Sequence, residues 1–205
     1  MIIGIDIGST TTKAVAVENG EIVKTVKTKA YDAITSATGA LGKIIVESNI
    51  AISNVEKIII TGAGAISIKN EIFGIPTRKI DEISAIGIGG MFLSKKESVI
   101  IANIGTGTSI IEATCEKITH LGGTGVGGGT ITGLSKELLN ATDFEHILEM
   151  AGRGDISKVD LLIEDISDSG SVSLAVNLPL QISGRCLILL KKRIWPSELS
   201  IWFSR

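Results

Sequence analysis

The sequence predicts an α/β protein built from two similar halves. Each half opens with a strand, a turn of glycine and hydroxyl residues, a second strand, a turn and a third strand, starting near residues 2 and 98. The first half continues into a helical segment and another apolar strand, the order expected for a parallel crossover. Seven of the 24 glycines fall between residues 122 and 133, and aromatic residues make up only 3% of the chain. We therefore expect function to reside in glycine loops.

Local signals define the elements of the first half. The Asn19-Gly20 pair favours a two-residue hairpin, and Asp81 is a good N-cap for the helix that follows Pro76. The predicted elements are strands at 2–7, 12–17, 22–28 and 57–61, and helices at 32–49 and from residue 81 to about 96. The last helix contains three glycines, each costing about 1 kcal/mol in a helix interior, so we expect another backbone to pack closely against it.

The second half repeats this pattern more weakly. Its predicted elements are strands at 98–104, 109–113 and 117–121, a helix ending near residue 139, and a helix capped by Thr142 with Glu145 that ends before Gly152. We expect one lobe at 1–97, a partial second lobe at 98–182 and a divergent tail at 183–205.

Composition excludes several classes of function. A formal net charge of -2 gives no electrostatic basis for a nucleic-acid or anionic-membrane partner. Cys115 and Cys186 match no metal-site or disulfide spacing. The first residues lack a basic region and include Asp6, unlike a signal peptide, and the apolar stretch at 83–93 is shorter than the roughly 17 residues of a membrane helix. We expect a cytoplasmic protein.

The first motif with a chemical interpretation is GIDIGSTTTKA, residues 4–14. An aspartate at a strand end, a glycine-hydroxyl turn and a lysine on the next strand are suited to wrapping a triphosphate. Asp6 could hold Mg²⁺ through water. The predicted phosphate-binding residues are Asp6, Gly8, Ser9, Thr10, Thr11 and Lys13. A polar hairpin with a capping aspartate is an equally good interpretation of this motif alone.

The second motif, ANIGTGTSI at 102–110, has the same form and supplies Gly105, Thr106 and Gly107. Two such hairpins, one in each half, could close on a nucleotide from opposite sides. The pair therefore favours a nucleotide site more than either motif alone.

The third motif, HLGGTGVGGGTITGLSKELL at 120–139, contains a GxGxxG pattern between a strand and a helix. That pattern is weak evidence for dinucleotide binding, because the neighbouring strands form a hairpin rather than a βαβ unit. A helix N-terminus still suits an anion. The phosphate-binding glycines predicted here are Gly125, Gly127, Gly128 and Gly129. No GK[ST] triplet occurs, which excludes a P-loop.

Glu82 is the remaining chemical candidate. A carboxylate at the start of an apolar helix can accept a hydroxyl proton during phosphoryl transfer. From the residues alone, the simpler interpretation is favoured: Asp81 caps the helix and Glu82 interacts with the helix dipole.

Taken together, the three motifs resemble type II pantothenate kinases, within the sugar kinase, Hsp70 and actin-like superfamily. The resemblance covers roughly residues 1–180, and its most specific parts are ANIGTGTS, GGTGVGGGTITGL and EMAGRGDISKVDLLIEDI. It implies an actin-like ATPase fold of the ribonuclease H-like type, with two lobes of which the second is incomplete here. It also implies ATP- and Mg²⁺-dependent phosphorylation of pantothenate, the first step of coenzyme A synthesis, and a homodimer for the complete family member.

The resemblance also implies residue roles. Glu82 matches the family's catalytic acidic residue, which reverses the preference stated above. Asp6, Gly8, Thr10 and Lys13 match its first phosphate loop, and residues 105–109 its second. Thr106 and Ser109 lie where the family contacts pantothenate. His120 stands where the family often has an arginine, and we list it with low weight as a substrate contact.

The resemblance stops near residues 179–182. The following tail has five basic residues and one acidic residue from residue 185 onward, and it holds both tryptophans. Such a switch is what a frameshift would produce, so we expect a truncated kinase. Two alternatives stay open. One is an inactive fragment. The other is an activator ATPase of a 2-hydroxyacyl-CoA dehydratase, a family whose resemblance implies cysteines bridging an iron-sulfur cluster, for which the chain has no suitable pair.

Overall fold

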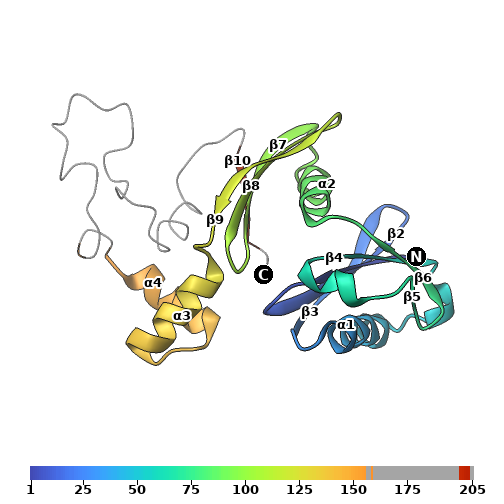
Figure 1. Cartoon of the computed structure of the whole chain (residues 1–205), viewed down its shortest axis with the longest axis horizontal. Helices are drawn as coiled ribbons and strands as arrows, with labels where there is room; N and C mark the ends of the chain where they lie inside the picture. Colours follow the sequence, from blue (N-terminus) through green and yellow to red (C-terminus); the bar gives the residue numbers. More distant parts are fainter. Residues whose placement is uncertain (156–157, 159–198, 204–205) are drawn as a thin grey trace. The chain divides into compact units, whose positions relative to one another are not determined.

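The computed structural model describes residues 1–155, 158 and 199–203. The chain divides into two compact units, Met1–Gly89 and Gly90–Arg205 (Figure 1). The division falls inside helix α2 (Glu82–Ser94), whereas the sequence predicted a boundary after residue 97. Residues 159–182 of the predicted second lobe and most of the predicted tail lie outside the described residues.

A six-stranded sheet forms the first unit. Its strands are β1 (Ile2–Ile7), β2 (Thr11–Glu18), β3 (Glu21–Lys29), β4 (Lys57–Thr61), β5 (Glu71–Ile72) and β6 (Ile75–Lys79). They lie in the order β3-β2-β1-β4-β6-β5. β1 pairs antiparallel with β2 and parallel with β4, so the predicted crossover is confirmed. Asn19 and Gly20 both have positive φ, 52° and 80°, as the predicted two-residue turn requires.

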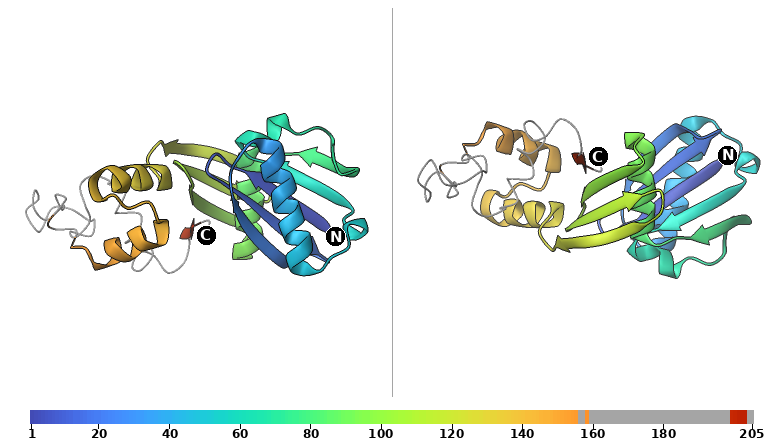
Figure 2. Two further views of the ribbon diagram at one scale, coloured as in Figure 1. Left: turned by 90° about the horizontal axis from the view of Figure 1, so that it is seen from below. Right: turned by 90° about the horizontal axis from the view of Figure 1, so that it is seen from above.

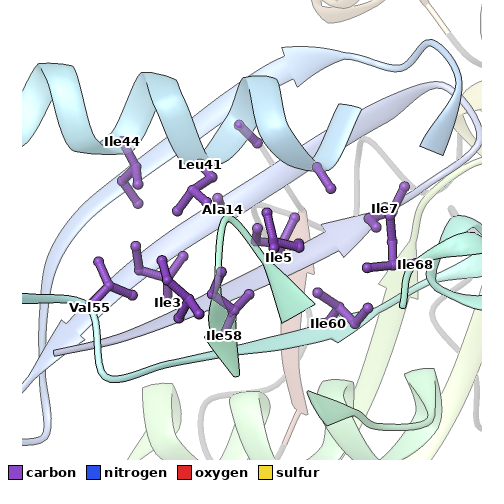
Figure 3. Close-up of a cluster of buried hydrophobic side chains, with 14 of the residues drawn as sticks. Ile3, Ile5, Ile7, Ala14, Leu41, Ile44, Val55, Ile58, Ile60 and Ile68 are labelled. Atoms are coloured by element: carbon purple, nitrogen blue, oxygen red, sulfur yellow. The ribbon is translucent and has the colours of Figure 1, made fainter. Parts of the chain in front are cut away.

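Helix α1 (Ala33–Ser48) covers one face of this sheet (Figure 2). It begins after Asp32, whose Oδ1 accepts hydrogen bonds from the amides of Ile34 and Thr35, and it is followed by Asn49 in the left-handed conformation. Strand residues alternate between the two faces, and the apolar set of β1 and β4 packs against α1 (Figure 3). The largest fully buried side chains of this core are Ile3, Ile5, Ile7, Leu41, Ile44, Ile58 and Ile60. Asp6 therefore projects from the face opposite α1.

The sequence did not predict the short β5–β6 hairpin. Its turn is Phe73-Gly74, in which Phe73 adopts a φ of 52° that large side chains rarely take. Pro76 in β6 also argued against a strand, because proline cannot donate to a ladder. β6 nevertheless pairs parallel with β4, and the ladder runs through Thr77, Arg78 and Lys79.

The glycines of α2 have a different environment from the one expected. A Cβ at Gly90 would collide with the side chain of Ile101, so a side chain rather than a backbone makes the close contact. Gly89 faces open space. The predicted packing of another backbone against this helix is therefore wrong at both positions.

A four-stranded sheet forms the second unit, in the order β10-β7-β8-β9. Its strands are β7 (Ser98–Ile104), β8 (Thr108–Thr114), β9 (Ile118–Thr124) and β10 (Leu199–Phe203). β7 pairs antiparallel with β8 and parallel with β10, just as β1 does with β2 and β4. The predicted internal repeat is confirmed. Residues 199–203 of the predicted divergent tail thus contribute a strand to this sheet.

Two helices follow β9, α3 (Gly128–Leu139) and α4 (Phe144–Arg153). The predicted cap of α4 at Thr142 is wrong, because the carboxylate of Asp143 accepts the His146 amide at 2.8 Å and makes Asp143 the N-cap. The helix also continues through Gly152 and ends at Arg153, with Gly154 as its C-cap. Within the described part of the chain, none of the helices has the length and apolar character needed to cross a bilayer.

Candidate functional site

Asp6 and Lys13 form a charged pair at the end of the β1–β2 hairpin. They are opposite each other in the antiparallel ladder, and Lys13 Nζ lies 3.5 Å from Asp6 Oδ2. About a third of each side chain is exposed, 34% for Asp6 and 29% for Lys13. An ion pair this accessible adds less than about 1 kcal/mol to stability. Both charges remain accessible to a ligand.

The loop between these two residues brings hydroxyl groups to the same end of the hairpin. Gly8 is required for the tight turn, because a Cβ there would lie 2.7 Å from the Thr11 carbonyl oxygen. Ser9 and Thr10 are exposed, and Thr11 is half-buried. The main chain of the loop is anchored where the Thr10 carbonyl accepts a hydrogen bond from the Ala30 amide at 3.0 Å. Donor groups that suit phosphate oxygens thus lie next to a lysine.

The end of β4 also lies beside Asp6, although none of the sequence motifs predicts it to be part of the site. Asp6 and Thr61 are register partners in the parallel pair. Gly62, with φ of 87°, packs so closely that a Cβ there would lie 2.5 Å from Asp6 Oδ1. A sequence signal for this contact was available, because Gly62 directly follows a strand predicted to be parallel to β1. The ends of neighbouring parallel strands lie close together.

Glu82 is the first residue of α2, whose N-cap is Asp81 as predicted: Asp81 Oδ1 accepts the Ser84 amide at 2.9 Å. Partial burial raises the pKa of Glu82 above its ordinary value, and the negative charge of Asp6 raises it further. Lys13 has the opposite, smaller effect. The side chain still has exposed surface. Glu82 is therefore an accessible carboxylate, and the charges of Asp6 and Lys13 both affect its pKa.

In the second unit, the other two predicted motifs pack against each other. The turn after β7 is closed by the Gly105 amide donating to the Gly107 carbonyl at 2.8 Å. The hydroxyl of Thr108 then donates to the Val126 carbonyl at 2.7 Å, joining the hairpin to the glycine loop. A Cβ at Gly127 would lie 2.7 Å from the carbonyl oxygens of the hairpin turn. Gly127 is thus needed for close approach of two backbones.

This packing engages amides at the start of α3. The Gly128 amide donates to the Gly105 carbonyl at 2.8 Å, and the Gly129 amide donates to the Thr106 carbonyl at 3.2 Å. Gly125 is exposed, with open space where a Cβ would be. Phosphate binding by these glycines stays a prediction. Their observed contacts are with the protein.

The predicted substrate residues lie on two neighbouring strands of the second unit. Ser109, in β8, is half-buried and pairs with Gly123 of β9. His120, in β9, is exposed and pairs with Ile111. Thr106 is exposed in the turn before β8. Contacts of these three residues with pantothenate stay predictions.

The described residues contain no group of three or more His, Cys, Asp or Glu side chains that could enclose a metal ion. The candidate for a cation is Asp6, a single accessible carboxylate. That donor set fits Mg²⁺, which keeps most of its water and binds through one or two carboxylates plus substrate phosphates.

Comparison with known proteins identifies relatives of both halves. A family model described as Fumble matches residues 98–183. A type II pantothenate kinase from Bacillus cereus strain ATCC 14579 is 41% identical over 93 residues, covering 43% of this chain and 34% of the relative. A type II pantothenate kinase from Staphylococcus aureus strain USA300 is 32% identical over 171 residues, covering 81% of this chain and 60% of the relative.

The chain is thus similar in sequence to type II pantothenate kinases. The resemblance predicted from the motifs is confirmed. The chain matches 34% of the length of one of these pantothenate kinases and 60% of the other.

Solved structures show the fold. The activator of the 2-hydroxyisocaproyl-CoA dehydratase from Clostridium difficile, with bound ADPNP, matches with a TM-score of 0.60 and 19% identity over 79% of this chain and 59% of that chain. A ROK family glucokinase from Streptomyces griseus, in complex with glucose and AMPPNP, matches with a TM-score of 0.51 and 21% identity over 75% of this chain and 72% of that chain. The predicted actin-like α/β fold class is confirmed.

Proposed function

We propose that this chain uses ATP to phosphorylate pantothenate, giving 4′-phosphopantothenate and ADP. Homology to type II pantothenate kinases supports the substrate. The observation that carries the chemistry is Glu82, an accessible carboxylate whose pKa is raised by partial burial and by the charge of Asp6. A base with a pKa nearer the working pH accepts a proton more effectively than an ordinary carboxylate.

In the proposed reaction, Glu82 accepts the proton of the primary hydroxyl of pantothenate. The hydroxyl oxygen then bonds to the γ-phosphorus of ATP, and the bond from that phosphorus to the bridging oxygen breaks, with its electron pair leaving on ADP. Lys13 and the donors of the Gly8–Thr11 loop hold the phosphate oxygens, whose negative charge they complement. The protein thus supplies a base at one end of the reaction and positive charge around the transferred group.

Asp6 would hold Mg²⁺ through water molecules. A bound Mg²⁺ supplies charge neutralisation on the phosphate oxygens. In this arrangement, Lys13 restrains the Asp6 carboxylate from the neighbouring strand.

The test is ATP-dependent conversion of pantothenate by the purified chain, followed by mass spectrometry, with Glu82→Gln as the critical variant. We expect kcat to fall about 10²- to 10⁴-fold, the typical contribution of a general base. Glu145→Gln is the matched control, because Glu145 also lies in the first turn of a helix whose N-cap is an aspartate. The control should retain wild-type kcat. Equal activity of Glu82→Gln and Glu145→Gln would exclude Glu82 as the base. Folded wild-type protein without turnover would favour an inactive fragment.

The second candidate is an ATPase that activates a dehydratase, favoured by the fold likeness to the activator from Clostridium difficile. The iron-sulfur cluster implied for that family needs suitably placed cysteines. Cys115 is exposed, and Cys186 lies outside the described residues. Anaerobic reconstitution with iron and sulfide would distinguish the candidates. A stable iron-sulfur absorbance band would favour the activator, and its absence together with pantothenate turnover would favour the kinase.

A further inference from the structure

Gly62 makes the closest approach to the Asp6 carboxylate from the end of β4. Its φ of 87° lies in the region that favours glycine. A Cβ at this position would lie 2.5 Å from Asp6 Oδ1 and 2.7 Å from the Ile7 carbonyl oxygen. Real Cβ atoms do not approach other atoms so closely, so any side chain at position 62 must move Asp6 or the backbone after it.

The other groups around Asp6 restrain it weakly. Lys13 Nζ is 3.5 Å from Asp6 Oδ2, at the long end of hydrogen-bond distances. Thr61 is the register partner of Asp6, yet its buried hydroxyl oxygen has no hydrogen-bond partner among the described residues. Thr61 therefore provides no hydrogen bond to the carboxylate. The space left by Gly62 is thus an important determinant of where the Asp6 carboxylate lies.

Two other glycines show that backbone conformation alone does not explain this contact. Gly20 and Gly74 have φ of 80° and 75°, close to that of Gly62, and a Cβ at either would meet nothing within 4 Å. All three belong to the first unit. Replacing any of them by alanine forces a positive φ that L side chains rarely adopt, but of these three positions only position 62 brings the added methyl group against the site carboxylate.

We infer that Gly62 is a positioning residue for Asp6: because Gly62 has no side chain, the Asp6 carboxylate can lie against the end of β4, within reach of Lys13. The inference deepens the proposed function and rests on it, because Asp6 is the residue that would hold the hydrated Mg²⁺ of the kinase reaction. Gly62 acts through the Asp6 carboxylate.

A double-mutant cycle on the full chain tests the contact without any need for activity. The first cycle compares Gly62→Ala, Asp6→Ala and the double variant with the wild type. The matched control cycle uses Gly74→Ala in place of Gly62→Ala. Removing the carboxylate removes the collision with Oδ1, whereas the backbone strain and the contact with the Ile7 carbonyl remain in both backgrounds. We expect Gly62→Ala to raise the unfolding equilibrium constant about tenfold more when Asp6 is present than when it is alanine. The Gly74 cycle should be additive.

A Gly62→Ala protein that folds only in the Asp6→Ala background would also support the inference. Additive effects in the Gly62 cycle, equal to those in the Gly74 cycle, would overturn it.

Positioning is then measured by NMR titration of the Glu82 carboxyl group, whose pKa the charge of Asp6 raises. Displacing Asp6 changes its distance from Glu82, so Gly62→Ala should move the Glu82 titration curve, whereas Gly20→Ala and Gly74→Ala should leave it unchanged. A Glu82 curve that stays in place in Gly62→Ala would overturn the inference. If wild-type protein phosphorylates pantothenate, Gly62→Ala should also lower kcat/KM for Mg·ATP about 10- to 100-fold. A shifted Glu82 titration curve with no turnover in the wild type would instead support the positioning role and contradict the proposed function.

Discussion

The two units place different side chains on the same strand arrangement. In the first unit, β1 ends in Asp6-Ile7 followed by Gly8, and in the second, β7 ends in Asn103-Ile104 followed by Gly105. Asp6 is opposite Lys13 across the hairpin, whereas Asn103 is opposite Ser109. One position thus carries a charged pair in the first unit and a neutral amide-hydroxyl pair in the second.

The surroundings of the two hairpins also differ, because charged groups flank the first loop and backbone groups pack on the second turn. The loop after β1 keeps Ser9 and Thr10 exposed beside a carboxylate and an ammonium group. The turn after β7 is covered by backbone from the glycine loop, and its carbonyls accept amides from the start of α3. The repeat therefore supplies one geometry, and the residues at the strand ends give it an accessible charged pair in the first unit and a packed, neutral turn in the second.

Exchanging the charged group for the neutral one should have the largest effect on activity. Asp6→Asn gives the first unit the residue found in the second and removes the carboxylate that would hold a hydrated cation. We expect kcat/KM for Mg·ATP to fall at least about 100-fold, measured by pantothenate phosphorylation over a range of Mg²⁺ concentrations. Asp32→Asn, in the same unit at the α1 cap, is the control and should retain activity. Wild-type activity in Asp6→Asn would contradict the ionic role assigned to this hairpin.

The packing role of the second hairpin predicts a stability effect. A methyl group at Gly127 would overlap the turn carbonyls, so Gly127→Ala should lower the free energy of unfolding by about 1–3 kcal/mol, the usual cost of overpacking. Gly133 lies inside α3 with open space around it, so Gly133→Ala should be stabilising by about 0.5–1 kcal/mol through helix propensity. Urea denaturation of both variants measures the contrast. A neutral Gly127→Ala would show that the glycine loop does not depend on this close approach.

The charge on Asp6 also predicts a pH effect at Glu82. Burial is the larger cause of the raised Glu82 pKa and Asp6 the smaller one, so in Asp6→Asn that pKa should fall but remain above its ordinary value. A raised carboxyl pKa means that the folded state binds the proton more tightly than the unfolded state. Glu82 therefore favours folding at pH below its unfolded pKa, and this contribution is lost as the pH rises through the folded pKa. Carboxyl NMR titration checks the shift, with Asp32→Asn as a variant that should leave Glu82 unchanged. A rise of the Glu82 pKa in Asp6→Asn would contradict the assignment.

The smallest effect concerns the α1 cap of the first unit. Hydrogen bonds from Thr35 lower the pKa of Asp32, so its contribution to stability is present above its unfolded pKa and is lost as the pH falls through the lower folded value. Unfolding of Asp32→Ala should consequently differ from wild type at neutral pH and converge with it in acid. A constant difference across that range would show that the charge of Asp32 does not contribute.

Local signals account for what the sequence predicted correctly. Strand alternation, the Asn19-Gly20 turn and the Asp81 cap each depend on residues close in sequence, and all of them agree with the structure. The β5–β6 hairpin was missed because Phe73 takes an unusual conformation in its turn. Tertiary pairing decided that conformation, and local propensity could not predict it.

In the candidate site, too, contacts between segments close in sequence were predictable and contacts between distant segments were not. Opposed positions on a hairpin follow from the turn length, so the Asp6–Lys13 pair was predictable. The roles of Thr61 and Gly62 depend on the parallel register of β1 and β4, which are separated by the whole of α1. The docking of the glycine loop on the Gly105–Thr108 turn likewise depends on backbone contacts that no residue pattern specifies.

The parallel pairing of β1 with β4 also has a consequence for the order of folding. The β1–β2 and β2–β3 hairpins join neighbouring segments, whereas β4 must return across α1 before it can pair, at a greater cost in loop-closure entropy. We expect the transition state for folding of the first unit to contain the hairpins and to lack the β4 junction. A substitution at Gly62 should then change the unfolding rate far more than the folding rate, since its contact with Asp6 forms late. The charged site would be assembled among the last steps of folding and lost among the first steps of unfolding.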